Sequence, residues 1–532
     1  MAAATLPSSD ASPCLWTRRF LWLLAGVFVF RVAYLFTAVD FQLGGDEAYY
    51  WDWGRRPDWC YYSKPPLIGW LMGLLRITFG YHWWAVRLAA ITLGTVSLGL
   101  LFALGRRLFD ARTGFYAALM LLLTPANAAA NFAFTIDSPL VLCWTGALLA
   151  FWNVTTKPDR RRGWFLLTLA IGIGALAKQM MLAFPGVMLL YALFSAEDRV
   201  LLKRPAFWLS ILGGLAFMIP LVWWNEQHGW VTLTHTKEHF HHQVLGLGRR
   251  LWQFVSFPIY QAGVYSPITF ELLMAALAVR IGAWKAAQRR ERFLLLFSVP
   301  GLAVFVFLAM RQDVNPNWPA VFYLSAFVLG AHHALQSTSL RRWLDLGLKL
   351  GGAVVLFIYL IAPLIPVLGW KGHKKFDPFV SMRGWDEAGL LVGRLYEKVP
   401  DPAHTFVFVL DHRHNASQMA FHMPQHPRVY RWSPEGKIES QYEVWQQGDD
   451  KTGWDGFVIY PDSPEDGYKK KPLQSVVAKS FKHVEKLGDA DVPVGNGVQR
   501  SFQVFLCKDL QHWPGPDTPK AAAAPHKPTP SS

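Results

Sequence analysis

The chain contains many apolar windows of about 18–22 residues that carry almost no charge, and this pattern restricts its fold more than any other feature. A helix needs about 20 apolar residues to cross the roughly 30 Å hydrocarbon layer of a bilayer. Of the 532 residues, 52% are hydrophobic and only 17% are charged, which is too apolar for a soluble protein. We therefore expect an α-helical polytopic membrane protein with about 11 to 13 transmembrane helices, the upper number applying if a broken helix pair lies near 120–137.

The expected spans share length and low charge, and they cover residues 20–39, 84–104, 113–126, 138–154, 164–177, 179–195, 206–224, 262–282, 293–310, 318–336 and 347–369. Every second loop between them is short and basic. These loops contain Arg18 and Arg19, Arg106 and Arg107, Lys157 with Arg160, Arg199 with Lys203, Lys285 with Arg289, and Arg341 with Arg342. Short basic loops are typical of the cytoplasmic side of a membrane. Residues 1–19 are then cytoplasmic, and the net charge of +15 is explained by topology without a nucleic-acid partner.

The composition changes after residue 370, where mixed polar sequence replaces the apolar spans. Short β-like runs at 404–410, 428–432, 455–460 and 500–506 alternate with loop or helical segments such as 415–422. We expect a membrane domain over 20–369 and a small extracytoplasmic α/β domain over 370–510. The tail 511–532, rich in Pro, Ala and Lys, is too polar to form a core and is expected to be disordered.

The loop after the first span, GGDEAYYWDWGRRPDWCYYSKPPLIGW, carries the most unusual residues. It opens with adjacent carboxylates, Asp46 and Glu47, and ends on Lys64 before two prolines. A carboxylate in a partly dry cleft can accept a proton from an attacking hydroxyl, and a lysine on a stiff support can stabilise a leaving phosphate. Aromatic residues such as Tyr61 and Tyr62 offer a binding surface for a polar lipid-linked group. The alternative is an interfacial aromatic belt.

Further ionisable residues lie on the same expected side of the membrane. Asp137, in FTIDSPL, is a second candidate catalytic acid, or alternatively the N-cap of the next helix. Arg87 and Lys178 are candidate phosphate ligands, although Arg87 also fits an interfacial snorkelling residue. Lys178 has almost no polar neighbours in sequence, which favours an anionic partner.

Four more residues are candidate substrate contacts. His235 and His239 fall in the run THTKEHFHHQ, where histidines one helical turn apart could bind a metal. Without a second group of metal ligands, solvated or acceptor-binding histidines are the favoured interpretation. Asn225 and Asn317 lie in the outer segments WWNEQHGW and VNPNWPA, where Asn317 is either a helix-start residue or a ligand contact.

Several motifs in order resemble one enzyme family over about residues 20–430. They are GGDEAYYWDW with YYSKPPLIGWL, AVRL (85–88), FTIDSPL (134–140), LAKQ (176–179), WWNEQHGW (223–230) and VNPNWPA (314–320). The sequence resembles the bacterial polyprenyl-phosphate-dependent glycosyltransferases of GT-C architecture. Within them it is similar to the protein O-mannosyltransferase-like and lipid A aminoarabinose-transferase-like enzymes.

The resemblance implies site roles and a location. The acid after the first span, which maps to Asp46, would be the base or would position the acceptor. Asp137 maps to the acid of the second outer loop, and Lys64 maps to the lysine that contacts the carrier phosphate. The aminoarabinose transferases typically have a metal-binding Glu where this chain has Ser63, so we carry over no metal site and expect no cofactor. The protein would sit in the bacterial cytoplasmic (inner) membrane with its active site facing the periplasm or exterior.

The predicted function is transfer of a sugar from a polyprenyl-phosphate donor to a hydroxyl or phosphate of an envelope acceptor, with inversion. The acceptor would be a lipid A-like glycolipid, a polysaccharide or a protein. The alternatives are a lipid-phosphate flippase or transporter, and a non-catalytic membrane protein that binds a glycolipid. A transporter is expected to place its charges near the middle of the membrane and to have related halves, whereas these acids gather at one face and no repeat is visible.

Overall fold

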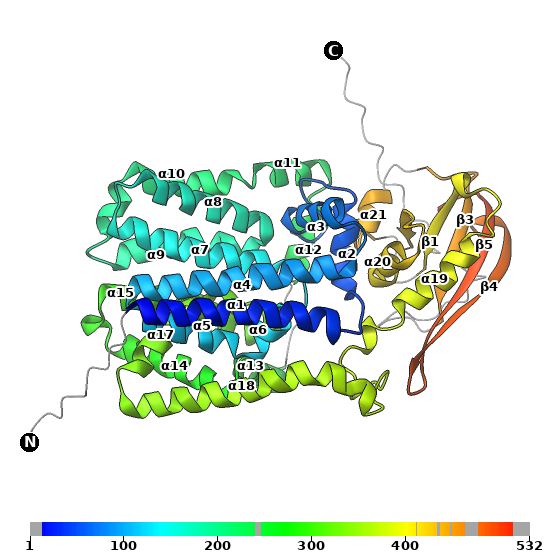
Figure 1. Cartoon of the computed structure of the whole chain (residues 1–532). Helices are drawn as coiled ribbons and strands as arrows, with labels where there is room; N and C mark the ends of the chain where they lie inside the picture. Colours follow the sequence, from blue (N-terminus) through cyan, green and yellow to red (C-terminus); the bar gives the residue numbers. More distant parts are fainter. Residues whose placement is uncertain are drawn as a thin grey trace, which may run out of the picture. The chain divides into compact units, whose positions relative to one another are not determined.

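The computed structural model describes residues 13–239, 246–410, 412–432, 437–446, 450–462 and 477–513. The chain divides into two compact units (Figure 1). One unit takes in Met1–Asp40 and Trp53–Gly369, and the other takes in Phe41–Asp52 and Trp370–Ser532. The sequence analysis assigned residues 41–52 to the membrane domain, whereas in the structure this short segment, which carries both Asp46 and Glu47, packs with the C-terminal residues.

The first unit is built from helices. Its α-helices are α1 (Pro13–Thr37), α3 (Leu67–Phe79), α4 (Trp83–Leu108), α5 (Ala111–Leu122), α6 (Pro125–Ala130), α7 (Asp137–Thr156), α8 (Arg161–Ala177), α9 (Ala183–Phe194), α10 (Pro205–Ala216), α11 (Ile219–Gln227), α12 (Val231–His239), α13 (Leu247–Tyr265), α14 (Pro267–Gly282), α15 (Arg289–Leu296), α16 (Val299–Ala309), α17 (Ala320–Leu335) and α18 (Thr338–Val367). Three 3₁₀ segments join them, η1 (Gln179–Leu182), η2 (Arg199–Lys203) and η3 (Trp284–Ala286).

The helical unit confirms a multi-pass membrane protein, although fewer helices are long enough to span than expected. Within the described residues, six are long and apolar enough to cross a membrane, and the bent pair α13 and α14 would make seven. The expected spans 113–126, 179–195 and 318–336 instead correspond to shorter apolar helices. Helix α17 illustrates the reason, because almost all of its residues are buried by neighbouring helices. Apolar sequence of this kind marks a helix surrounded by protein as readily as one that faces lipid.

Two buried arginines fix the chain around the short helix α6. Arg31 of α1 is 1% exposed, and it donates hydrogen bonds to the Tyr359 hydroxyl of α18 at 3.0 Å and to Asn127 Oδ1 of α6 at 2.7 Å. Arg87 of α4 donates to the carbonyl of Phe132, just after α6, at 2.7 Å. A buried guanidinium is stable only when it is well hydrogen-bonded. These contacts therefore tie the segment that leads into α7 to three long helices.

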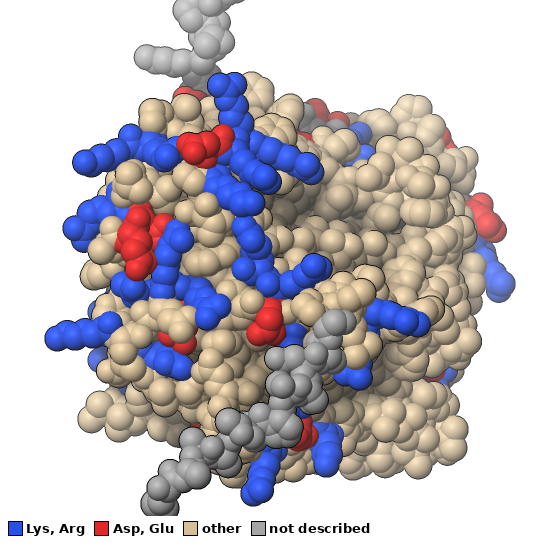
Figure 2. Space-filling view, turned by 60° about the vertical axis from the view of Figure 1, so that its left-hand side comes forward, with Lys and Arg blue, Asp and Glu red and all other residues tan. Residues whose placement is uncertain are grey.

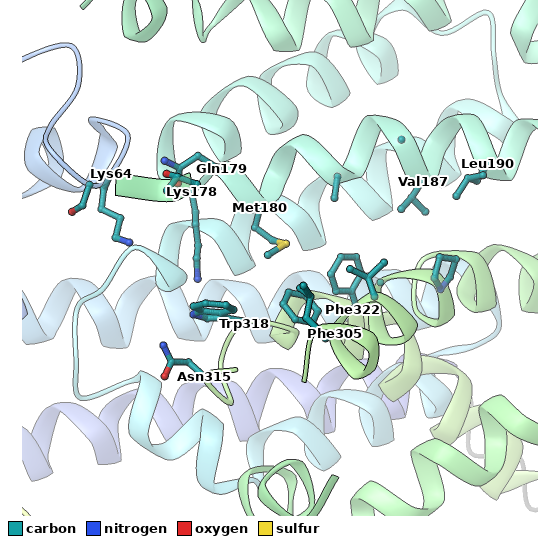
Figure 3. Close-up of a pocket in the computed structure, with 18 of the residues that line it drawn as sticks. Lys64, Lys178, Gln179, Met180, Val187, Leu190, Phe305, Asn315, Trp318 and Phe322 are labelled. Carbon is teal, nitrogen blue, oxygen red and sulfur yellow. The ribbon is translucent and has the colours of Figure 1, made fainter. Parts of the chain in front are cut away.

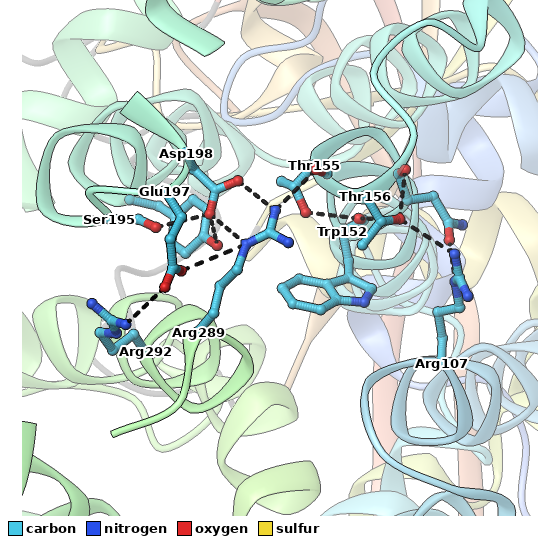
Figure 4. Close-up of polar contacts among 11 residues, drawn as sticks. Arg107, Trp152, Thr155, Thr156, Ser195, Glu197, Asp198, Arg289 and Arg292 are labelled. Carbon is cyan, nitrogen blue, oxygen red and sulfur yellow. Dashed lines mark hydrogen bonds and ion pairs between the residues drawn. The ribbon is translucent and has the colours of Figure 1, made fainter. Parts of the chain in front are cut away.

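Basic side chains gather over one end of the helical unit, the end on the left in Figure 1 that Figure 2 brings forward. Figure 4 shows an ion-pair network at the helix ends, centred on Arg289 at the start of α15. Its guanidinium contacts both oxygens of Asp198, at 2.5 and 2.8 Å, and donates to the carbonyl of Thr155 at 2.9 Å. It also lies over the Trp152 ring, 5.2 Å from the centroid. This bidentate pair links the end of α7, the segment after α9 and the start of α15.

The second unit contains a five-stranded sheet in the order β2-β1-β3-β5-β4. The strands are β1 (Thr405–Val409), β2 (Val429–Arg431), β3 (Asp455–Pro461), β4 (Phe481–Gly495) and β5 (Val498–Leu510). Strand β1 is parallel to β2 and β3, and β5 is antiparallel to β3 and β4. Four of the five strands overlap the expected runs, whereas β4 was not expected. It is mostly polar and half-exposed, so it lacks the apolar run that marks a strand, and it is joined to β5 by the turn Asn496-Gly497, where both φ angles are positive.

The remaining helical segments belong to this unit, with α2 contributed by the inserted residues 41–52. They are α2 (Gly45–Gly54), α19 (Trp385–Tyr396), α20 (Arg413–His422) and α21 (Gln441–Gln446), with the 3₁₀ segments η4 (Val380–Met382) and η5 (Pro402–His404). Helix α19 packs against α20, β4 and β5, and α20 also packs against β1 and β2. Apolar side chains of β1, β2, β3 and β5, with Phe406, Phe408 and Val458 among them, form the core on the sheet.

Candidate active site

The helical unit contains a cavity of about 650 Å³ with a basic end and an apolar end. Its polar lining includes Ser63, His235 and Thr236, and Lys64, Lys178, Gln179 and Asn315 lie toward one end (Figure 3). The remaining wall is apolar and comes mainly from η1, α9, α16 and α17, with the residues Met180, Ala183, Val187, Leu190, Val304, Phe305, Leu308 and Phe322. In Figure 3 Lys64 and Lys178 point into one end, while Val187 and Leu190 lie at the other. A site of this shape suits an anionic group attached to a long apolar chain.

The basic end of the cavity contains an ion pair that the sequence does not reveal. Lys178 Nζ lies 2.7 Å from Asp137 Oδ1, and Asn317 Nδ2 donates to Asp137 Oδ2 at 2.8 Å. Both charged side chains are mostly buried, with exposed fractions of 13% for Lys178 and 20% for Asp137. Asp137 is the first residue of α7 and its side chain does not cap the helix, so the capping alternative is wrong. Because both of its oxygens are engaged, Asp137 is better placed to orient Lys178 than to accept a proton from substrate.

Lys64 reaches the cavity from a tightly folded segment. The N–H of Tyr61 donates to the Lys64 carbonyl at 3.1 Å, and Pro65 and Pro66 then lead into α3. The ring of Tyr62 packs against His235 of α12, with 4.6 Å between centroids, and His235 itself lines the cavity. The structure therefore brings Lys64, Lys178 and His235 to one cavity, as the sequence analysis expected of a shared site.

Three expected site residues have structural roles in the helical unit. Tyr61 is fully buried and donates to the carbonyls of Trp53 and Arg56, so it holds its own loop together. Asn225 is also fully buried, and its amide group bonds the carbonyl of Leu221 and the N–H of Thr232. Arg87 binds the Phe132 carbonyl and is absent from the described cavity wall. These three residues shape segments of the helical unit, and direct contact with substrate stays a prediction for them.

The two acids of residues 41–52 differ in environment within the second unit. Glu47 is 2% exposed and accepts a hydrogen bond from the Gly44 N–H at 2.9 Å, so it stabilises the start of α2. Its burial and this hydrogen bond give Glu47 a structural role, and its catalytic role stays a prediction. Asp46 has an exposed side-chain fraction of 55%, and its Oδ1 lies 3.2 Å from Nε2 of His414. Asp46 is thus the more accessible carboxylate, as a general base requires.

His414 is a residue that the sequence analysis missed. It belongs to the run His412-Arg413-His414-Asn415, which follows strand β1 and begins α20. Polar residues after the carboxyl end of a parallel strand are a known position for functional groups. That signal was present, but nothing in the sequence connects residue 414 with residue 46.

The histidine run was also a candidate metal site. The side chain of His239 lies outside the described residues, as does the segment 240–245. Among the residues that the structure describes, no three His, Cys, Asp or Glu side chains lie close enough together to hold a metal ion. The four cysteines, all of them in described segments, are free thiols.

Comparison with known proteins supports this fold and a transferase class. The family described as dolichyl-phosphate-mannose-protein mannosyltransferase matches residues 63–224. Lipid A galacturonosyltransferase RgtD of Rhizobium johnstonii is 26% identical over 435 residues, which are 80% of this chain and 87% of that protein. An undecaprenyl phosphate-alpha-4-amino-4-deoxy-L-arabinose arabinosyl transferase of Pseudomonas aeruginosa is 29% identical over 184 residues, 34% of this chain and 32% of that protein.

A solved structure has the same architecture. The crystal structure of ArnT from Cupriavidus metallidurans bound to undecaprenyl phosphate aligns with a TM-score of 0.62 over 92% of this chain and 98% of that chain, at 16% identity. Fold, cavity and relatives together define a multi-pass membrane glycosyltransferase. The family match, the named relatives and the shared fold support a polyprenyl-phosphate-dependent glycosyltransferase of GT-C architecture, the family that its motifs resemble.

Proposed function

We propose that the protein transfers a sugar from a polyprenyl-phosphate donor to lipid A or a closely related envelope glycolipid, on the periplasmic face of the bacterial inner membrane. The observation that carries the proposal is the cavity of about 650 Å³ with Lys64 and Lys178 at one end and apolar walls from α9 and α16. The carrier's phosphate would bind at the lysines and its isoprenoid chain along the apolar walls. The names of two relatives, a lipid A galacturonosyltransferase and an undecaprenyl-phosphate-dependent transferase, support the same substrates.

The charge at the basic end suits a phosphate that gains charge during the reaction. An acceptor oxygen attacks the anomeric carbon, and the bond from that carbon to the phosphate oxygen breaks. The departing phosphate keeps the bonding electrons, so its charge becomes more negative as it leaves. Lys64 and Lys178 stabilise this added charge more in the transition state than in the ground state, which is the condition for rate acceleration.

Asp137 makes Lys178 a fixed cation. The 2.7 Å ion pair and the hydrogen bond from Asn317 restrict the lysine to one position before substrate binds. A preorganised cation needs no rearrangement when the leaving group develops charge. The proton of the acceptor hydroxyl passes to the carboxylate of Asp46, a role that we assign on its exposure and its position after the first span. Displacement in one step inverts the anomeric centre.

A transfer assay with the purified full-length protein tests this function. The donors are undecaprenyl phosphate linked to galacturonic acid and, separately, to 4-amino-4-deoxy-L-arabinose, and the acceptor is lipid A. Mass spectrometry should detect lipid A heavier by one sugar with one of these donors. No sugar on lipid A with either donor would contradict the proposed substrates.

Lys64→Ala tests the basic end of the cavity. Loss of one group that stabilises the developing charge should lower kcat on the order of 100-fold and raise the KM for the donor. Lys64→Arg should restore part of the rate, because a planar fork replaces a compact ammonium. Lys157→Ala, at the exposed basic end of the helices, is the matched control and should behave as wild type. A raised KM for lipid A with an unchanged KM for the donor would place the lysine at the acceptor instead.

A further inference from the structure

One face of helix α20 lies against the segment that carries Asp46, and both belong to the second compact unit. His414 Nε2 lies 3.2 Å from Asp46 Oδ1. One turn further along, Ser417 Oγ contacts the Gly45 carbonyl at 3.4 Å, and Gln418 Nε2 donates to the Leu43 carbonyl at 2.8 Å. Spacings of three and four residues place these side chains on one side of a helix.

The helix continues this contact with an aromatic pair. Phe421 of α20 meets Trp51 of α2 edge-on, with 4.8 Å between ring centroids. Helix α21 holds the same segment from another position, since Tyr442 donates to Asp52 at 2.8 Å and the N–H of Gln441 donates to the Tyr49 hydroxyl at 2.5 Å. The C-terminal residues therefore hold the helix of the candidate base at several points along its length.

Gly45, the residue before Asp46, leaves space for the ring of His414. A Cβ atom at Gly45 would lie 2.4 Å from Cγ of His414 and 2.7 Å from its Nδ1. Every residue other than glycine would push the ring away at this position. The close approach of His414 to the residue before Asp46 is thus built into the backbone and does not depend on the hydrogen bond alone.

We propose that His414 is a positioning residue for Asp46, the base that the proposed function assigns, within the second compact unit. The imidazole N–H on Nε2 donates to Asp46 Oδ1 and fixes the orientation of the carboxylate. During the reaction the proton of the acceptor hydroxyl moves to Asp46, and His414 keeps its own proton throughout. The inference rests on the proposed function, because it acts through the base which that function assigns.

The hydrogen bond from His414 affects the orientation of the Asp46 carboxylate toward the acceptor hydroxyl and leaves substrate affinity unchanged. A rotating carboxylate presents its lone pairs to the acceptor hydroxyl for only part of the time, and misplacement by about 1 Å can cost on the order of 100-fold in rate. Asp46 is half-exposed on the first turn of a helix, and the hydrogen bond from His414, whose ring packs against Gly45, contributes to selecting its rotamer.

Three variants of the full-length protein test the inference by measuring kcat and KM with the donor that the transfer assay identifies. His414→Phe keeps a ring of similar size without an N–H, and kcat should fall roughly 10- to 100-fold while both KM values change little. His414→Gln places an amide donor near the position of Nε2 and should recover most of the lost rate. His422→Phe is the matched control, because His422 lies on the same helix and pairs with a different carboxylate, Asp386, at 2.6 Å.

Each outcome separates this inference from the function on which it rests. Asp46→Asn should abolish transfer, and full activity in that variant would overturn the assignment of the base itself. If Asp46→Asn is inactive while His414→Phe keeps the wild-type kcat, the proposed function stands and the positioning role is wrong. An equal loss in His422→Phe and His414→Phe, or a failure of His414→Gln to exceed His414→Phe, would assign the effect to the packing of the domain. The melting temperature of each variant identifies any that is misfolded.

Discussion

At the scale of single residues, the close packing of the His414 ring against Gly45 predicts different effects of an alanine at Gly45 and at Gly44. In Gly45→Ala the added methyl group would lie 2.4 Å from His414 Cγ, so the ring must leave its position next to Asp46. We expect kcat to fall by about tenfold or more without loss of donor binding. The measurement is the transfer assay together with donor KM.

Gly44→Ala is the control for that variant. Its Cβ would meet the terminal methyl of Met382 at 3.2 Å, a flexible group that can move aside. Gly44→Ala should therefore retain activity. Equal activity of the two alanine variants would show that the position of the His414 ring has no influence on the reaction.

Residue-scale prediction from sequence succeeds where a charge is unusual in its surroundings. Lys178 was identified because a cation with apolar neighbours needs a partner, and Lys64 because it precedes two prolines that stiffen its support; both line the cavity. The sequence could not supply the partner itself. Asp137 and Asn317 are 180 residues apart and meet only through the packing of α7 with the loop before α17. For the same reason the sequence could not reveal that Tyr61 and Asn225 bond the backbone of neighbouring segments, because such hydrogen bonds cannot be read from residue types.

At the scale of elements, the Arg289–Asp198 pair should stabilise the junction of three helices. Asp198 is 3% exposed, and removing its countercharge leaves a buried carboxylate that only the hydroxyls of Tyr191 and Ser195 still stabilise among its described contacts. Because Arg289 is itself 30% exposed, we expect Arg289→Ala to cost about 2–3 kcal/mol, less than for a fully buried pair. Thermal unfolding in detergent should show a melting temperature lower by several degrees.

Arg292→Ala is the matched control on the same helix. Its partner Glu197 is 53% exposed at 3.4 Å, and exposed pairs of this kind contribute little. The melting temperature of Arg292→Ala should stay close to that of wild type. Similar decreases in melting temperature in the two variants would mean that burial of Asp198 does not make its ion pair more stabilising than an exposed one.

The sequence predicts a helix or strand correctly where the residues of that element show a clear hydrophobic pattern of their own. The strands β1 and β3 are short apolar runs that are buried on both faces, and both fall within about one residue of the expected range. Strand β4 alternates too weakly to be recognised, and it forms because the Asn496-Gly497 turn folds it back onto β5. Hydropathy likewise located α17 but could not tell that its surroundings are protein, because that depends on helices distant in sequence.

At the scale of the whole molecule, the distribution of basic residues predicts the orientation of the chain in the membrane. Lys and Arg gather at the helix ends seen in Figure 2, which fits the cytoplasmic side, and the alternation of basic loops along the sequence predicts a periplasmic C-terminal unit. Cys14 is exposed near the start of α1 and serves as a native reporter of the basic side. The other three thiols are buried, and burial raises the pKa of the Cys60 thiol to about 11 and that of the Cys507 thiol to about 12, so neither is a reactive thiolate at neutral pH.

A membrane-impermeant maleimide should therefore label the wild-type protein in intact spheroplasts only after the membrane is permeabilised. In a Cys14→Ser background, Lys451→Cys should be labelled from outside, because residue 451 belongs to the C-terminal unit. Lys157→Cys, exposed at the end of α7 on the basic side, is the matched position and should require permeabilisation. Labelling of both new cysteines from the same side would contradict the topology. His414 lies in the same unit as residue 451. A periplasmic reaction that depends on His414 would then be wrong as well.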